Sequence, residues 1–209
     1  KNNKHKWEEA FTRAPRYKVY IGWLILFVGA SVLHTLRFMF IDYGIKEIGL
    51  SKELASFLSG SLAGFMAIGS LISAFYIKFL ERKRVFTIIG LLTPIALSII
   101  LITNNFYLLL MSFLFLGLVS GFGYFFGLYY ALADQENSTS NVAVNEALTG
   151  IAALIMPFIF GYIASNLSYF MAFLFMMIIS LICYTIAIYT MWQKKRTAML
   201  KEKFNNLVK

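Results

Sequence analysis

Long apolar stretches alternate with short polar ones along most of the chain. Residues 85–133 contain no Asp, Glu, Lys, Arg or His, and neither do residues 147–193. A helix needs about 20 apolar residues to cross the roughly 30 Å hydrocarbon core of a bilayer, and its backbone satisfies its own hydrogen bonds there. Six segments have this character: 19–43, 54–79, 85–102, 106–132, 142–165 and 169–192. The pattern predicts an all-α membrane protein, built as a bundle of six transmembrane helices.

Polar residues separate and flank the six segments. The basic run 81–84 separates the second segment from the third, and Thr-Asn-Asn at 103–105 separates the third from the fourth. A run rich in Ser, Thr and Asn at 134–141 precedes the fifth, and such residues favour turns and helix starts. We therefore expect three parts: a basic cytoplasmic lead-in at 1–18, a six-helix transmembrane domain at 19–193 and a basic cytoplasmic tail at 194–209.

Composition and charge support a membrane protein and orient it. Hydrophobic residues make up 59% of the chain and charged residues 14%, whereas a soluble domain carries about 25% charged residues. With six spans, sixteen of the 19 Lys and Arg residues lie on the side that holds both termini, and two lie on the other side. Because basic loops stay in the cytoplasm, we expect a multi-pass protein of the cell membrane with both termini cytoplasmic. The basic residues flank apolar spans, so we expect no nucleic-acid partner.

Small residues recur at four-residue spacing on three of the predicted helices, which gives a smooth stripe that a second helix can approach closely. The stripes comprise Ser56, Gly60 and Gly64, then Gly117 with Gly121 and Gly123 with Gly127, and finally Ala153, Pro157 and Gly161. The third span holds one glycine and the sixth holds none. We interpret the third and sixth helices as lipid-facing and the other four as packed around an interior. The alternative interpretation is that the small residues serve static packing alone.

Ionisable side chains inside a membrane are costly and usually face protein or water, so they mark functional candidates. His34 and Arg37 are three residues apart on the first span and therefore share a helical face. At about 1.5 Å per residue they fall in the outer half of the hydrocarbon core, where they can contact a substrate or a coupling ion. Alternatively, Arg37 extends to the outer interface and His34 is hydrogen-bonded within the bundle. Asp42, at the outer end of the same span, is expected to be solvated.

The fifth span supplies the one carboxylate that lies well inside a predicted helix, Glu146. A carboxylate there can carry a proton across the membrane, and Asn145 adjoins it. The alternative is that Glu146 lies in the first helical turn and complements the helix dipole. Tyr124, Tyr129 and Tyr130, near the cytoplasmic end of the fourth span, either line a cavity or anchor the helix at the interface.

Two stretches and the overall layout resemble the major facilitator superfamily. The segment 41–51 (IDYGIKEIGLS) is similar to the first outer loop in the C-terminal half of such proteins, and the segment 145–161, which begins NEALTG, looks like their penultimate helix. In the basic loop between the second and third spans, Lys78 stands where the family carries an acid and Glu81 where it carries glycine, which argues against a charge-relay gate there. The six-span layout with lipid-facing third and sixth helices is the stronger match. The chain thus resembles the C-terminal six-helix half of a twelve-helix permease.

The resemblance implies two inverted three-helix repeats, a partner half of similar shape and a substrate site between the halves near the middle of the membrane. We accordingly expect a secondary active transporter that moves a small solute by alternating access and is coupled to protons. Its partners are then a small-molecule substrate, H+, the lipid bilayer, and either an N-terminal six-helix half encoded upstream or a second copy of the chain. The chain begins with Lys1 rather than Met, which suggests that it is cut from a longer protein. No cofactor or metal is expected.

Two other functions stay open at this point. A non-transporting membrane scaffold or assembly protein also fits the six spans. An intramembrane serine protease of the rhomboid type has a similar size, and Ser120-Gly121 invites the comparison. However, His5 and His34 both precede this serine, so the general base that it needs is missing downstream. We therefore expect no enzyme activity and no catalytic residue.

Overall fold

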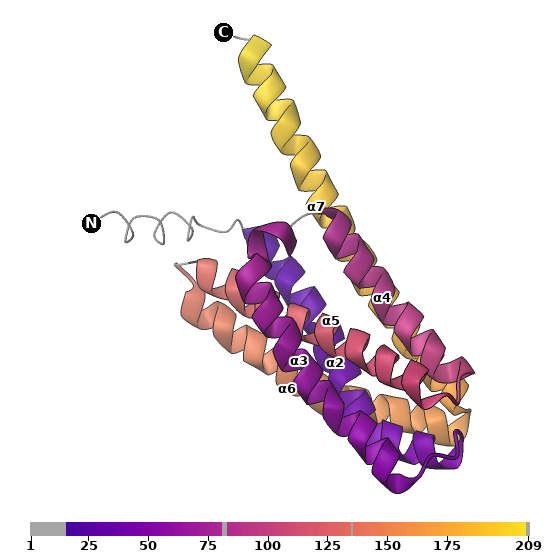
Figure 1. The fold of residues 1–209 in the computed structure, drawn as a ribbon. Helices are drawn as coiled ribbons and strands as arrows, with labels where there is room; N and C mark the ends of the chain where they lie inside the picture. The colour runs from indigo at the N-terminus through magenta and orange to yellow at the C-terminus, as the bar shows by residue number, and fades with distance from the viewer. Residues whose placement is uncertain (1–15, 81–82, 135, 208–209) are drawn as a thin grey trace.

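The computed structural model describes residues 16–80, 83–134 and 136–207, which are helical apart from short connecting turns. The helices follow one another along the chain (Figure 1): α2 (Arg16–Lys46), α3 (Lys52–Leu80), α4 (Lys83–Ile102), α5 (Phe106–Ala133), α6 (Ser138–Asn166) and α7 (Tyr169–Leu207). Each predicted span corresponds to one of these helices, so the all-α fold is confirmed. Among the described residues, five helices are long and apolar enough to cross a membrane. The apolar stretch of α4, Thr87–Ile102, is shorter.

Several helices extend beyond the apolar segments that revealed them. α2 begins at Arg16 and α6 at Ser138, so both start before the predicted spans. α7 continues without a break to Leu207 and leaves the bundle (Figure 1), so the helix includes most of the segment predicted as a separate tail. Hydropathy marks only the part of a helix that lies in hydrocarbon, whereas the helix itself can continue through the headgroup region. Most of the predicted lead-in 1–18 lies outside the described residues.

The helices α2 and α5 form the centre of the bundle, with α3 and α6 on one flank and α4 and α7 on the other (Figure 1). α5 packs on α3 and α4, α2 packs correspondingly on α6 and α7, and α4 packs on α7. Exchanging α2–α4 for α5–α7 therefore reproduces most of the contacts, as two inverted three-helix repeats require. The four helices predicted to surround an interior are not equivalent, because α3 and α6 are covered on one side only and are more exposed than α7.

Two pairs of glycines let α5 approach a different neighbour on each of two faces. A Cβ at Gly121 would lie 2.1 Å from the Met66 carbonyl oxygen of α3, and Gly117 meets the same helix. A Cβ at Gly123 would lie 2.8 Å from the Ile25 carbonyl oxygen of α2. Gly127 also approaches α2, at Leu26. The pairs are six residues apart and therefore about 120° apart around the helix. Backbone contact this close makes glycine necessary on both faces.

Not every glycine of the predicted stripes has a neighbour. A Cβ at Gly60 or Gly64 would meet open space, and Ser56 on the same helix is exposed. The contact between α3 and α5 instead uses Gly69, whose Cβ would lie 2.4 Å from the Leu118 carbonyl oxygen. The face of α3 with Ser56, Gly60 and Gly64 thus has no covering helix among the described residues.

This difference predicts opposite outcomes for two identical substitutions. Gly121→Ala should lower the free energy of unfolding by about 1–3 kcal/mol, because the new methyl group forces α5 away from the Met66 carbonyl. Gly60→Ala adds the same methyl group in open space and should change stability by no more than about 0.5 kcal/mol. Thermal unfolding of the two variants in one detergent measures the difference, and equal midpoints would contradict the packing described for α5.

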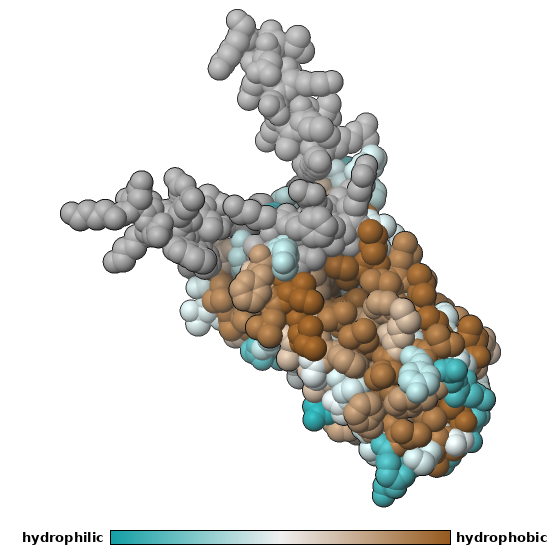
Figure 2. Space-filling view, in the orientation of Figure 1, coloured by the Kyte–Doolittle hydropathy of each residue, from teal (hydrophilic) through white to brown (hydrophobic). Residues whose placement is uncertain are grey.

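Apolar residues cover most of the face seen in Figure 2, and hydrophilic residues gather mainly toward the end with the α2–α3, α4–α5 and α6–α7 turns. Aromatic rings close this end of the core: Phe40 contacts Phe113 with centroids 4.5 Å apart, and Tyr43 contacts Phe173 at 5.0 Å. The Tyr43 hydroxyl donates to the Ile100 carbonyl (3.2 Å), which fixes α2 against α4. Edge-to-face ring pairs of this kind stabilise a core beyond their buried area.

Candidate functional site

One side of α2 is left uncovered by the helices around it. Tyr20, Phe27, His34 and Ile41 are exposed or half-buried, although most of the other side chains of this helix are buried. These four residues are spaced by seven, which is close to two helical turns, so they follow one side of the helix along its length. A continuous open stripe therefore runs along the most central helix of the bundle.

The stripe runs between α3 and α6. On one side, the Ser59 hydroxyl of α3 donates to the Arg37 carbonyl of α2 (2.8 Å). On the other side, the Met39 sulfur of α2 lies 3.6 Å from the Cβ position of Gly161 on α6. Both neighbours have uncovered faces of their own.

His34 and Arg37 lie on this stripe. The imidazole is half-buried and the Arg37 side chain is exposed. Within the part of the chain that the structure describes, the Arg37 guanidinium forms no salt bridge, whereas the nearby Lys46 ammonium pairs with the Asp42 carboxylate at 2.9 Å. A cation without a carboxylate partner is available to an anionic ligand, or it extends to the interface.

Next to the stripe, a groove of about 680 Å³ lies along the outer side of the contact between α2 and α6. Its lining is predominantly apolar and comprises Phe38, Met39, Ala153, Leu154, Pro157, Phe158, Gly161 and Tyr162. Phe38 follows Arg37 directly and lies one turn beyond His34, so the two ionisable residues adjoin the α2 wall of the groove. An apolar groove with a few polar groups at its edge is typical of small-molecule sites.

Pro157 gives the α6 wall of this groove a polar feature. Proline has no backbone N–H, so the Ala153 carbonyl, four residues earlier, lacks its usual helical donor. Ala153 and Pro157 both line the groove, and Gly161 one turn further on leaves space for a ligand. The Ala153 carbonyl oxygen can therefore accept a hydrogen bond from a ligand, even though the side chains of this wall are apolar.

Asn145 and Glu146 are adjacent on α6 but occupy opposite environments. Asn145 is fully buried against Gly127 of α5, and among the described residues neither its Oδ1 nor its Nδ2 has a hydrogen-bond partner. Glu146 is exposed. Because α6 begins at Ser138, Glu146 lies more than two turns inside the helix rather than in the first turn. The alternative that Glu146 lies in the first turn is therefore wrong, and a dipole-capping role does not fit this location.

The three tyrosines of α5 do not form one group. Tyr130 is buried, its ring lies below the Lys18 ammonium at 5.4 Å, and its centroid is 5.4 Å from that of Tyr129. Tyr129 also stacks on Phe125. Tyr124 is half-buried, and among the described residues no ring contact joins it to the other two. Tyr129 and Tyr130 thus belong to an aromatic cluster at the end of α5 that is predicted to be cytoplasmic.

Sequence reasoning missed a link at the other end of the bundle. Asp42 is exposed, as expected, but it also accepts a hydrogen bond from the Tyr169 hydroxyl at the start of α7 and pairs with Lys46. The four-residue spacing of Asp42 and Lys46 is a readable signal for the ion pair. No sequence pattern joins Asp42 to Tyr169, which is 127 residues away.

Ser120, the serine considered for protease chemistry, takes part in helix packing. It is buried between α5 and α2, and its hydroxyl donates to the Gly29 carbonyl (3.0 Å). Among the described residues, no group of three or more His, Cys, Asp or Glu side chains is placed to hold a metal ion.

Comparison with known proteins adds a match over almost the whole chain. Residues 6–206 match the family model described as the Major Facilitator Superfamily. No curated protein matches the chain.

Proposed function

Because the chain belongs to the Major Facilitator Superfamily, we propose that it forms one half of a secondary transporter that moves a small organic anion with protons by alternating access. Membership of this family makes the protein a multi-pass membrane transporter. The identity of the solute, the driving ion and the presence of a second half are our proposals. The observation that carries the proposal is the exposed Arg37 beside an apolar groove on the open surface of α2 and α6.

The chemistry of the groove favours an anion with an apolar body. A guanidinium binds a carboxylate or sulfonate through two parallel hydrogen bonds, and no carboxylate pairs with Arg37 among the described residues. Phe38, Phe158 and Tyr162 line or border the groove and suit an aromatic or aliphatic group. His34, one turn before Phe38, supplies a second polar contact at the same wall.

The uncovered faces of α3 and α6 favour a second six-helix unit on the same side as Arg37. Gly60 and Gly64 on α3 and Gly150 on α6 all have open space where a side chain would be. Small residues at a membrane surface normally permit close helix contact. A second half, supplied upstream in the same polypeptide or by a second copy, would cover these faces and enclose the groove between the two units.

Glu146 is our candidate for proton coupling. It lies two turns before Ala153 on α6, so the carboxylate and the groove share one face of the helix. Enclosure by a second half would remove Glu146 from water and make its protonation sensitive to which side is open. The neighbouring Asn145 amide is buried without a hydrogen-bond partner among the described residues, which costs about 1–3 kcal/mol. This cost favours exchange of α6 with a second conformation.

The test is uptake by the purified protein in liposomes, with three radiolabelled probes: p-aminohippurate as an aromatic anion, tetraethylammonium as a cation and glucose as a neutral solute. We expect an inward proton gradient to accumulate p-aminohippurate, by about tenfold per pH unit for one coupled proton, and a protonophore to abolish this accumulation. Accumulation of either other probe in its place, or of none of the three, would contradict the organic-anion assignment.

Glu146→Gln separates coupling from transport. This variant should still exchange p-aminohippurate across the membrane but should lose proton-driven accumulation, because Gln cannot carry a proton. Glu47→Gln removes an exposed carboxylate from the loop after α2 and is the matched control, expected to accumulate the probe normally. Proton-driven accumulation by Glu146→Gln at the wild-type level would exclude Glu146 as the proton carrier.

A further inference from the structure

The two three-helix repeats differ at one interface. α6 and α7 contact each other, whereas their counterparts α3 and α4 scarcely touch within the described residues. Both α3 and α4 instead pack on α5. The structure therefore has a groove above α5, between α3 and α4, where the other repeat has helix contact.

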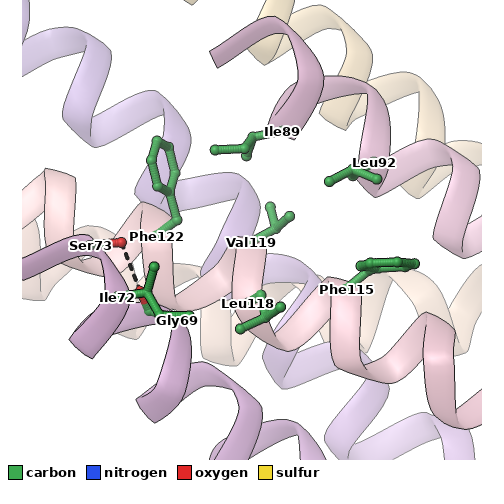
Figure 3. Close-up of a pocket in the computed structure, with 9 residues that line it drawn as sticks. All are labelled: Gly69, Ile72, Ser73, Ile89, Leu92, Phe115, Leu118, Val119 and Phe122. Carbon is green, nitrogen blue, oxygen red and sulfur yellow. Dashed lines mark hydrogen bonds between the residues drawn. The ribbon is translucent and has the colours of Figure 1, made fainter. Parts of the chain in front are cut away.

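This α3/α4 groove is a cavity of about 230 Å³ (Figure 3). Ile72 and Gly69 of α3 form one wall, Ile89 and Leu92 of α4 the other, and α5 forms the floor with residues that include Val119. Figure 3 shows Ile89 and Leu92 pointing from α4 into the space above α5. An apolar cavity of roughly 150 Å³ is already large enough to hold benzene, so this groove can hold several methylene groups.

The groove offers a ligand almost no hydrogen-bonding group. Its one polar side chain, among the nine residues that line it, is Ser73, and the Ser73 hydroxyl donates to the Gly69 carbonyl at 2.8 Å (Figure 3). The hydroxyl is thus satisfied within α3. A wholly apolar cavity stays dry and accepts apolar matter, so the groove suits a hydrocarbon chain rather than a polar solute.

The position of the groove leads to lipid and not to the Arg37 site. Ile88, Leu91 and Ile95 on α4 are exposed beside it, on the flank of the bundle predicted to face the bilayer. Arg37 and the α2/α6 groove lie instead on the open side of α2, between α3 and α6. An occupant of the α3/α4 groove therefore enters sideways from the membrane.

Basic residues at the helix ends near one end of the groove indicate which lipid headgroup would bind there. The last turn of α3 carries Lys78 and the first turn of α4 carries Lys83 and Arg84. On α3 the backbone departs from helical geometry at Tyr76, between Ser73 and Lys78. On α4, Ile89 lies five residues after Arg84 and six after Lys83, which is roughly 8–9 Å along the helix. This is the distance at which a headgroup would lie if its acyl chain filled the groove. Clustered Lys and Arg at the cytoplasmic ends of helices attract anionic headgroups.

We propose that the α3/α4 groove is a binding site for one anionic phospholipid of the cytoplasmic leaflet. One acyl chain occupies the space between Ile72, Ile89 and Val119, and the headgroup lies by the cationic helix ends that carry Lys78, Lys83 and Arg84. The site rests on the predicted cytoplasmic orientation of these ends and is independent of the transported solute. The bound lipid takes the place that helix contact holds in the second repeat.

Native mass spectrometry of the purified protein, titrated with phosphatidylglycerol or phosphatidylcholine of identical acyl chains, tests the site. Wild type should retain one phosphatidylglycerol about a hundredfold more strongly than phosphatidylcholine, because three cations at the helix ends contribute about fivefold each. Ile89→Trp fills the groove with an indole and should lose this retained lipid. Ile88→Trp adds the same ring at the neighbouring exposed position and is the matched control, expected to bind as wild type.

A charge variant tests the headgroup separately from the acyl chain. Lys83→Gln with Arg84→Gln should reduce the preference for phosphatidylglycerol by about fivefold or more for each cation removed. Lys201→Gln with Lys203→Gln, near the end of α7, changes the net charge by the same amount and should leave the preference for phosphatidylglycerol intact. If Ile89→Trp unfolds, Leu92→Phe repeats the filling test. Equal lipid retention by a folded groove-filling variant and by wild type would overturn the site, and an unchanged preference in the double charge variant would overturn the anionic headgroup.

Discussion

Replacing Arg37 by Gln should weaken binding of the transported organic anion by about tenfold to a hundredfold. A hydrogen bond to a charged group contributes about 1.5–3 kcal/mol, and Gln removes the charge while keeping a polar side chain of similar length. The half-saturation constant for p-aminohippurate should therefore rise by this factor. Thermal stability should stay within about 0.5 kcal/mol of wild type, because the Arg37 side chain is exposed and forms no salt bridge among the described residues.

Two further variants show whether this loss is specific. Arg37→Lys keeps the charge but cannot form two parallel hydrogen bonds to a carboxylate, so uptake should fall to an intermediate level. Lys46→Gln removes another cation from the same helix, and it should leave the half-saturation constant unchanged because Lys46 is occupied by Asp42. If Arg37→Gln bound p-aminohippurate as tightly as wild type, the side chain would serve only to place its charge at the membrane interface.

The sequence was sufficient for the number of spans because the apolar runs are longer than any soluble core element needs. It was poorer at helix ends, as α6 shows. Ser138, Thr139, Ser140 and Asn141 were assigned to a loop from their turn preference, but they form the first turn of α6, where Ser and Thr are also accepted. The four-residue shift places Glu146 more than two turns inside α6 and removes the alternative that it complements the helix dipole.

The sequence predicted only those features of the candidate site that lie within one helix. The three-residue spacing of His34 and Arg37 placed both on one face of α2, and both lie on its open stripe. The groove needs Phe38 on α2 to meet Pro157 on α6, and no pattern within one helix encodes that pairing. Charge drew attention to Glu146, whereas burial singles out Asn145. Adjacent helical residues point about 100° apart, so their environments follow from packing and not from spacing.

Placing a large side chain on the uncovered face of α3 should separate the proposed second half and abolish transport. Gly60→Trp inserts an indole where the structure has open space, so the six-helix unit should keep its own stability. If a second half packs against Gly60, the indole overpacks that interface. Overpacking costs about 1–3 kcal/mol or more, which corresponds to roughly a tenfold to hundredfold loss of association. Uptake of p-aminohippurate should then fall at least to a tenth of wild type.

The control must add equal bulk on the flank expected to face lipid. Thr185 on α7 is exposed there, and Thr185→Trp should transport normally because acyl chains rearrange around the ring. Native mass spectrometry of Gly60→Trp distinguishes the two possible sources of the second half. A second copy would dissociate and the mass would fall by half, whereas an upstream half in the same polypeptide would leave the mass unchanged while uptake is lost. Wild-type uptake and mass in Gly60→Trp would mean that the small-residue face of α3 contacts lipid, and the groove beside Arg37 would then have to be closed by something other than a helix packed on α3.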